Sequence, residues 1–500
     1  MKKIWMGEIF LFLKQDCYRV KNRQLRFLLC CGLILLFFSF WCVIIYSMEG
    51  SAVSLNNEAL GYLDKGMVDE ALPLLEKAYE MDKENEVIRR NLITAYNIKA
   101  KEYEKGGNYN LCVDEYQKVL SKFSKDSLTL NNFITSLNNI GVSFCEKRDY
   151  VESEKYFHFA VNLLREYKDK ELSQVVSVNY AQLLNNLAYR DYLNQEMVAV
   201  INDLKRSLRL DPSNPDTYQF LGEIYYDANN YDYAQTYFEK ALKITPANSH
   251  LRGRLSMLLR EKKVEEDFFR MSDNEKKFVI SFQSDKDKEQ VTTILDLLGK
   301  AYQKIGGDLE FYPKSQISVK IYTSQQFNYV TEMPDWAIGL YDGKIRLKYD
   351  EIRSDLFNLK QTIYHELAHS MISIMIKKTL PVWIQEGFAQ YEEPNKDITF
   401  EDMKLVVKEY QKNGIEGLGF NSVEQIGLYD KDYLDKLYMS SRIFVDYLIR
   451  TYELNKFRLF LIENLEERNW KAAFKKAYGK DFEVILDEWM KYLKWNIIGK

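Results

Sequence analysis

A repeating pattern of small and aromatic residues constrains the fold of this chain more than any other sequence feature. Its clearest unit runs from Pro215 to Asn248 and places seven residues at fixed offsets, namely Leu221, Gly222, Tyr225, Ala234, Phe238, Ala241 and Pro246. The unit before it, 181–214, keeps the same register, so the pattern has a period of 34 residues. Small residues at such positions let two antiparallel helices approach closely, and an aromatic side chain fills the remaining gap. The sequence therefore predicts stacked helix pairs.

Looser copies of this unit occupy the upstream part of residues 52–250, for example around Ala71, Cys112 and Ser153. The whole stretch resembles the tetratricopeptide repeat family. The resemblance implies a right-handed helical solenoid with a concave groove that commonly binds peptides or proteins. We therefore expect a protein partner in the groove, and we interpret the Tyr and Phe residues at repeat positions as core side chains.

An apolar segment near the N-terminus predicts a membrane anchor. Phe27 to Tyr46 contains no charged residue, and a helix of this length spans a hydrocarbon core of about 30 Å. A cluster of Lys and Arg between residues 14 and 26 precedes it, which by the positive-inside rule places residues 1–26 in the cytoplasm. The sequence thus predicts a single-pass protein of the cell membrane whose repeats and C-terminal domain lie outside the cytoplasm.

Two alternatives to this anchor remain open. The first is a cleaved signal peptide, although the apolar region is longer than is usual for signals and Gly50-Ser51-Ala52 makes a poor cleavage site. In the second, the whole chain is cytoplasmic and the apolar helix is buried in a partner.

Charge and cysteine content exclude further classes of function. The 69 basic and 73 acidic residues leave a net charge of −4, which offers no general attraction for a phosphate backbone, so we expect no nucleic-acid partner. Cys112 and Cys145 are the two cysteines beyond the apolar segment. Both occupy small-residue positions of predicted helices, which favours buried thiols over a disulfide.

The hydrophobic pattern changes near residue 285, where a new domain is predicted to start. Residues 317–321 alternate as a strand, and the segments 336–341 and 344–348 flank a tight turn as a β-hairpin. Helices dominate from 355 onward. The predicted architecture is mainly α, with a cytoplasmic segment at 1–26, a transmembrane helix at 27–46, a repeat solenoid at 52–250, a helical linker at 251–289 and, at 290–500, an α+β domain with a small antiparallel sheet.

The most informative motif is the pentad His365-Glu366-Leu367-Ala368-His369, which holds two of the four histidines of the chain. Residues four apart on a helix lie one above the other, so both imidazoles can bind one zinc ion while Glu366 reaches a metal-bound water. A catalytic zinc needs a third protein ligand and an open position, and Glu386 in the following segment is the candidate. The sequence therefore predicts a zinc site made by His365, His369 and Glu386.

With these residues, the C-terminal domain resembles the gluzincin metallopeptidases, the group that includes thermolysin and the zinc aminopeptidases. Metzincin spacing is absent, because Ile372 and Met375 stand where that pattern needs Gly and His. The resemblance implies a zincin-like fold, with His365 and His369 as metal ligands, Glu366 as general base and Glu386 as the carboxylate ligand. The position four after Glu386, often acidic in thermolysin-like members, is Gln390, so the partner that orients the histidines is left open.

A mechanism follows from these roles. Glu366 takes a proton from the zinc-activated water and delivers it to the leaving amine. The developing oxyanion needs a further donor, for which Tyr438 is the candidate, although a Tyr on such a helix face is commonly part of a core. The segment Lys344 to Lys348 either adds an extended substrate as another strand or is a structural hairpin.

Two functions from different classes follow. The first is a membrane-anchored, extracytoplasmic zinc peptidase, preferably an endopeptidase, that cleaves a protein or peptide substrate recruited or positioned by the repeats. The alternative is a tethered scaffold for protein assembly in which the C-terminal domain is catalytically silent.

Overall fold

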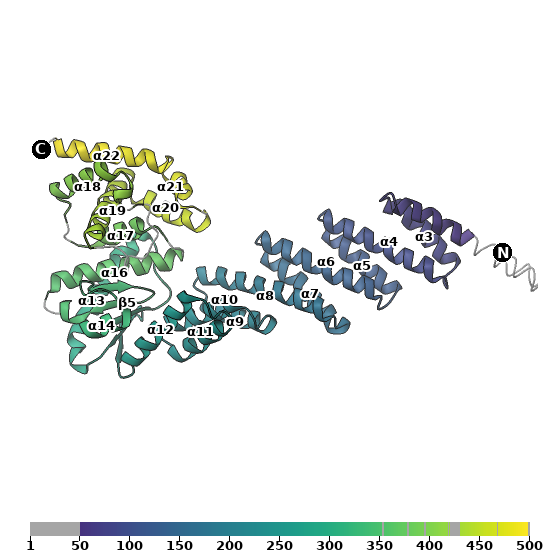
Figure 1. Cartoon of the computed structure of the whole chain (residues 1–500), viewed down its shortest axis with the longest axis horizontal. Helices are drawn as coiled ribbons and strands as arrows, with labels where there is room; N and C mark the ends of the chain where they lie inside the picture. The colour runs from purple at the N-terminus through teal and green to yellow at the C-terminus, as the bar shows by residue number, and fades with distance from the viewer. Residues whose placement is uncertain are drawn as a thin grey trace, which may run out of the picture. The chain divides into compact units, whose positions relative to one another are not determined.

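The structure is a computed structural model, drawn in Figure 1, that describes residues 51–498 apart from 353–354, 378–379, 395–396, 419, 421–430 and 468. By its internal contacts the chain divides into two units, Met1–Leu183 and Leu184–Lys500.

Antiparallel helix pairs make up the first unit. Its helices are residues 51–63, α3 (Val68–Met81), α4 (Glu86–Lys105), α5 (Tyr109–Lys122), α6 (Ser127–Glu146), α7 (Tyr150–Tyr167) and the first part of α8 (Lys170–Leu193). Small residues lie where paired helices touch. Gly141 of α6 faces the ring of Phe157 of α7, which an added Cβ would approach to 3.1 Å. In this unit Cys112 is buried and Cys145 is partly buried.

The second unit begins with the last helical repeats. They comprise the end of α8, α9 (Met197–Leu210), α10 (Pro215–Asp227), α11 (Tyr231–Ile244) and α12 (Ser249–Val264). The pair α10 and α11 is the helix pair predicted for 215–248, and that prediction is confirmed. Gly222 lies so close to the ring of Phe238 that an added Cβ would overlap it, which explains the small residue at this position.

A five-stranded mixed sheet follows in the same unit. Its strands are β1 (Phe269–Ser272), β2 (Phe278–Phe282), β3 (Ile317–Tyr322), β4 (Gly339–Tyr341) and β5 (Ile345–Lys348), in the order β1-β2-β3-β5-β4. The predicted strand and hairpin are confirmed, since β4 and β5 pair antiparallel. The prediction of a purely antiparallel sheet is wrong, because β3 pairs parallel to both β2 and β5. Helix α13 (Lys288–Leu309) makes the crossover that a parallel pair requires.

The segment 251–289 differs from the helical linker that the sequence predicts. Helix α12 and the short η1 (Asp285–Asp287) lie in it, but so do strands β1 and β2. Strand β2 pairs with β3 along its length, from Phe278 opposite Ile317 onward. This segment is therefore part of the sheet.

The two faces of the sheet have opposite chemical character. Alternate residues of β3, such as Val319 and Ile321, join a large apolar core that contains residues of α13 and α16 (Leu356–Ile376). The residues between them include Lys320, which is also fully buried but lies on the opposite face. On β5, Arg346 is fully buried in the same way. The polar face of the sheet is thus covered by protein as well.

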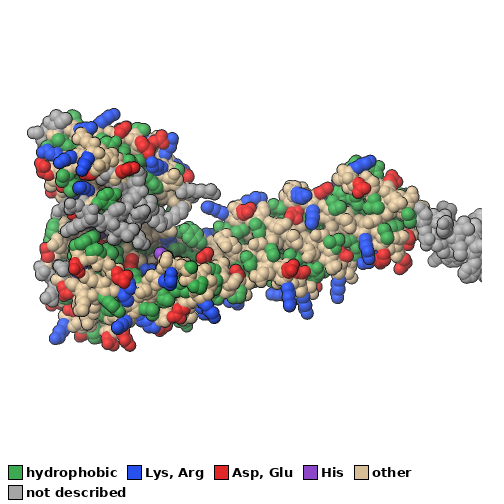
Figure 2. All heavy atoms as spheres, in the orientation of Figure 1, with side chains coloured by type: hydrophobic (Ala, Val, Ile, Leu, Met, Phe, Trp, Pro, Cys, Tyr) green, Lys and Arg blue, Asp and Glu red, His purple; other side chains and the backbone are tan. Residues whose placement is uncertain are grey.

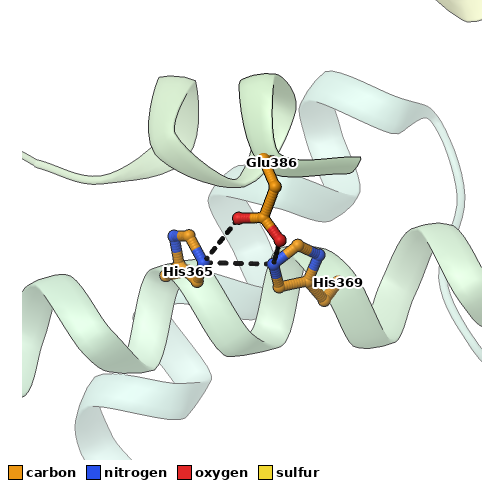
Figure 3. Close-up of side chains that lie close together, drawn as sticks. All are labelled: His365, His369 and Glu386. Carbon is orange, nitrogen blue, oxygen red and sulfur yellow. Dashed lines mark hydrogen bonds and ion pairs between the residues drawn. The ribbon is translucent and has the colours of Figure 1, made fainter. Parts of the chain in front are cut away.

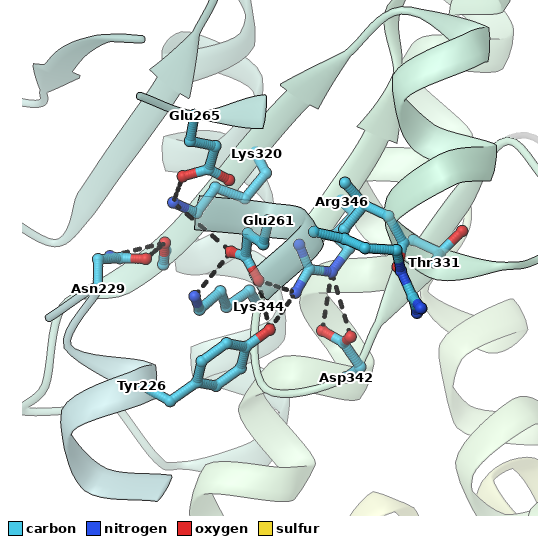
Figure 4. Close-up of polar contacts among 12 residues, drawn as sticks. Tyr226, Asn229, Glu261, Glu265, Lys320, Thr331, Asp342, Lys344 and Arg346 are labelled. Carbon is cyan, nitrogen blue, oxygen red and sulfur yellow. Dashed lines mark hydrogen bonds and ion pairs between the residues drawn. The ribbon is translucent and has the colours of Figure 1, made fainter. Parts of the chain in front are cut away.

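The last repeats cover that polar face with acidic and aromatic side chains (Figure 4). Glu261 of α12 accepts hydrogen bonds from Lys344 at 2.8 Å and from Arg346 at 3.0 Å. Glu265 accepts one from Lys320 at 2.5 Å. The five side chains are at most 1% exposed. Burial of so much charge is tolerated only because each ion has partners, and removal of one partner of such a pair typically costs about 3–5 kcal/mol.

Helices form the remainder of the second unit. They are α14 (Ser324–Thr331), α15 (Tyr349–Ile352), α16, α17 (Val382–Glu392), α18 (Phe400–Asn413), η2 (Glu416–Leu418), α19 (Lys431–Tyr452), α20 (Leu454–Glu466), α21 (Trp470–Tyr478) and α22 (Phe482–Ile498). Their core centres on Trp383 of α17, whose fully buried ring contacts those of Phe444, Phe460 and Phe482. This core fixes α17 against α19 and α20.

The predicted single-pass membrane localisation is contradicted and is withdrawn. Among the described residues, no helix combines the length and the apolar composition that a membrane crossing requires. The predicted span, 27–46, lies outside the described residues. On the face drawn in Figure 2, acidic and basic side chains are interspersed over the described surface.

The buried charges predict where an independently folding fragment must begin. Residues 290–500 alone lack β1, β2 and the helices that cover the polar face, so the sheet loses two of its five strands and its basic side chains lose the carboxylates of Glu261 and Glu265. We expect this fragment to be unfolded or aggregated and residues 184–500 to unfold in one cooperative transition, as measured by circular dichroism during heating. A cooperative transition of the shorter fragment at the same temperature would contradict the expectation.

Candidate active site

Helix α16 carries the pentad that the sequence singled out. Its first turn is capped by Asp355, whose side chain accepts hydrogen bonds from the amides of Phe357 and Asn358. The helix then runs without a break through His365 and His369, which lie one turn apart on the same side (Figure 3). The regular helix therefore produces the juxtaposition of imidazoles that the spacing predicts.

Helix α17 brings Glu386 over the two histidines (Figure 3). It begins after Pro381, and its buried face packs on α19. Gly387 makes that packing possible, because a Cβ there would lie 2.6 Å from the carbonyl oxygen of Ser441. Gly387 therefore allows α17 to pack closely against α19.

The three side chains converge tightly enough to share one metal ion. His365 Nε2 and His369 Nε2 are 3.1 Å apart, and they lie 3.4 Å and 3.5 Å from the carboxylate oxygens of Glu386. All candidate ligand atoms lie within 4.8 Å of one another. Glu386 Oε2 is buried and accepts no hydrogen bond from the described part of the chain. Two imidazole nitrogens and a carboxylate with one unsatisfied oxygen suit a catalytic zinc ion.

The carboxylates around the trio stabilise positive charge at the histidines. Burial alone would lower the pKa of His365, but the carboxylates of Glu386 and Glu393 raise it well above its usual value. Burial alone would raise the pKa of Glu386, but His369 and His365 hold it far below its usual range. The Glu386 carboxylate therefore stays ionised and available as a ligand.

Glu366 is placed beside the trio and against the sheet. It is buried, and burial raises the pKa of its carboxyl group above the usual value. Strand β4 passes so close that a Cβ on Gly339 would lie 2.5 Å from Glu366 Oε1. A raised carboxyl pKa suits a group that accepts and returns a proton near neutral pH.

Glu393 is a site residue that the sequence reasoning missed. Its Oε1 lies 2.9 Å from Nδ1 of His365, on the side of the ring away from Glu386. A carboxylate in this position fixes the tautomer of the imidazole and increases its basicity toward a metal. Gln390, which the sequence pointed to as the position for such a group, lines a different cavity. The signal that could have found Glu393 is its position seven residues after Glu386, two helical turns along the same face.

A cavity of about 830 Å³ opens over these groups. His365, Glu366, His369 and Glu386 line it, and so does Tyr438 of α19. Burial and the nearby charges of Glu386 and Glu366 raise the pKa of the Tyr438 hydroxyl, which therefore keeps its proton. The structure thus brings all five predicted site residues to one cavity.

The strand that borders this cavity is β4, whereas the sequence offered 344–348 either as a strand that pairs with substrate or as a structural hairpin. Strand β5 pairs with β3 on one side and β4 on the other, so both its edges are occupied. Strand β4 is the edge of the sheet, and residues 338–342 line the cavity. The open strand edge therefore faces the candidate site from β4.

Apolar side chains line the approach to β4. Met333, Trp336, Ile338 and Val382 all line the cavity. Trp336 and Ile338 are 41% and 37% exposed, which is high for large apolar side chains. Exposed apolar surface beside a cluster of convergent polar groups is typical of a ligand-binding cleft.

The contact of Glu393 predicts its effect on metal affinity. We expect Glu393→Gln to raise the dissociation constant for zinc roughly 10- to 100-fold, because His365 loses its charged acceptor. Competition with a chromophoric chelator measures the affinity. Glu392→Gln is the matched control, since Glu392 contacts Lys304 and not a histidine. Equal zinc affinity of the two variants would show that Glu393 does not support the site.

Comparison with known proteins identifies two parts of the chain. Residues 300–495 match the Peptidase MA superfamily, and residues 215–248 match the tetratricopeptide repeat. No curated protein is similar enough to match the chain.

Solved structures similar to the chain include repeat proteins. The pilF protein of Pseudomonas aeruginosa is 21% identical, with 44% of this chain and 87% of that chain covered and a TM-score of 0.21. A thermophilic TPR protein of Thermus thermophilus is 18% identical, with 42% and 99% covered and a TM-score of 0.18. The TPR domain of P58(IPK) is 13% identical, with 87% and 98% covered and a TM-score of 0.18. The chain thus contains a Peptidase MA superfamily domain at 300–495, preceded by a tetratricopeptide repeat at 215–248.

Proposed function

We propose that the C-terminal domain is a zinc-dependent peptidase of the gluzincin type, with His365, His369 and Glu386 as the metal ligands. The observation that carries the proposal is the convergence of these three groups in one cavity that Glu366 also lines. The match to the Peptidase MA superfamily supports it. A bound zinc ion would supply a polarised substrate carbonyl and a water of lowered pKa.

The protein side chains then carry the proton transfers. Glu366 accepts the proton of the attacking water and later donates it to the leaving amine, a role for which burial has already raised the pKa of its carboxyl group. Tyr438 donates a hydrogen bond to the oxygen on which negative charge develops. Glu393 holds the ring of His365 in place throughout.

The edge strand indicates an extended polypeptide as substrate. Strand β4 can pair with the main chain of such a segment, which recognises the backbone and not a chain end. We therefore propose endopeptidase action, with an apolar substrate side chain packed against Trp336 and Ile338. The repeats recruit or position the protein that carries this segment.

Replacement of the base tests the proposal. We expect Glu366→Gln to lower the cleavage rate of an unfolded protein roughly 10²- to 10⁴-fold while zinc stays bound, because the amide cannot accept the proton. Glu392→Gln, which changes a buried carboxylate outside the cavity, should cleave like the unmodified protein. If the zinc-loaded unmodified protein cleaves no protein or peptide at all, the silent repeat scaffold replaces the peptidase as the function.

The apolar approach predicts a substrate preference. Peptides with Phe or Leu beside the scissile bond should be cleaved faster than those with Asp or Lys, and Trp336→Ala should reduce kcat/KM for the apolar peptides about tenfold. Trp495→Ala removes a tryptophan that is 72% exposed and does not line the cavity, so it should leave the preference intact. Mass-spectrometric cleavage profiling of a peptide mixture measures the substrate preference of both variants. If the cleavage profile of the Trp336→Ala variant is unchanged, Trp336 does not contact the apolar substrate side chain.

A further inference from the structure

The β4–β5 hairpin has two sides with different neighbours. Residues 338–342 line the cavity of the candidate site. The buried side chains of Lys344 and Arg346 face the last helical repeats (Figure 4), and Asp342 also contacts Arg254 of α12 through its carbonyl oxygen. Strand β4 has three residues and a single partner strand, so pairing within the sheet holds it only weakly.

The turn of the hairpin is held by a side chain from α12. Arg254 donates a hydrogen bond from Nη1 to the carbonyl oxygen of Asp342 at 3.4 Å, and Glu223 of α10 fixes the guanidinium through Nε at 2.9 Å. Gly343 has a φ of +103°, and a Cβ there would lie 3.1 Å from Oδ1 of Asp227, the last residue of α10. The tip of the hairpin therefore rests directly on the end of a repeat helix.

Arg346 links the turn to the repeats from inside the protein. Its Nε donates to both carboxylate oxygens of Asp342 at 3.1 Å. Its Nη2 donates to the hydroxyl of Tyr226 at 2.9 Å and to Glu261 Oε2 at 3.0 Å. One side chain thus connects the turn beside the cavity to residues of α10 and α12.

The hydroxyl of Tyr226 points toward Glu261 and Arg346 (Figure 4). Its hydroxyl donates to Glu261 while it accepts from Arg346. Lys344 lies 3.8 Å and Arg254 lies 4.2 Å from the centroid of its ring. The ring therefore makes cation–π contacts with one residue of the hairpin and one of the repeats.

We propose that Tyr226, Arg254 and Glu261 are positioning residues for substrate binding, through which the last repeats set the place of strand β4. This inference rests on the proposed function, since it takes β4 as the strand that pairs with substrate. The metal ligands and Glu366 lie on α16 and α17, outside this network. A looser hairpin should therefore weaken substrate binding and leave metal affinity unchanged.

The test is Tyr226→Phe in the full chain, because it removes one hydroxyl and keeps the ring and its cation contacts. Arg254→Lys is a second variant, which keeps the charge but lacks the planar donor set that spans Glu223 and Asp342. Ser318→Ala is the matched control. It removes a hydrogen bond of 3.1 Å from Asn229, which joins the same repeats to β3 and not to the hairpin.

Two measurements decide the outcome. Hydrogen–deuterium exchange of residues 338–343 should accelerate in Tyr226→Phe and Arg254→Lys but not in Ser318→Ala, with zinc affinity equal in all. For a cleaved peptide, KM should rise about three- to tenfold, and kcat should change less than KM. Unchanged exchange in the hairpin, or exchange that accelerates equally across the sheet in all three variants, overturns the inference. Because exchange needs no turnover, it decides the inference even if the proposed peptidase activity fails.

Discussion

Glu261 and Glu265, at the C-terminal end of helix α12, pair with three basic side chains that the sheet buries on its polar face, and the C-terminal unit depends on these contacts. Lys320, Lys344 and Arg346 are fully buried, which is costly unless each meets an anion. Glu261 and Glu265 meet that need, and the attraction of the cations holds the pKa of Glu261 well below its usual value. The sheet consequently has an apolar face for α13 and α16 and an ionic face for the repeats. The candidate site is then assembled on helices that the apolar face supports.

The parts of the fold that the sequence predicts are those with a local signal. Helix pairs follow from a 34-residue period, and the hairpin follows from a turn pair between two alternating segments. Strands β1 and β2 were missed because they are short and lie among charged residues, and β2 is stabilised by β3, which is distant in sequence. The mixed sheet was missed because β2 and β3 are far apart in the sequence. Their parallel pairing depends on helix α13, which returns the chain to the same end of the sheet. The alternation of apolar and polar residues in β3 is visible in the sequence. The neighbouring residues do not indicate that Lys320 is buried against Glu265.

The same distinction separates the predicted and the missed parts of the site. His365 and His369 lie four residues apart on one helix, so their geometry is local and the pattern predicts it. The spacing of seven residues puts Glu393 on the same face as Glu386, but its contact with His365 also depends on where α17 ends and on how α17 crosses α16. The identity of the edge strand likewise required the order of all five strands. These are properties of the assembled domain.

The buried charges on the polar face of the sheet also bear on how such proteins can be recombined. A helical repeat array is commonly regarded as an adaptor that can be exchanged between enzymes, as long as the linker is preserved. Here the final helices supply counter-ions to the interior of the neighbouring domain, so a donor array would have to bring acidic residues at the places of Glu261 and Glu265. Exchange of modules is therefore restricted to repeats of the first unit, upstream of Leu184, and the last ones must be inherited together with the sheet that they cover.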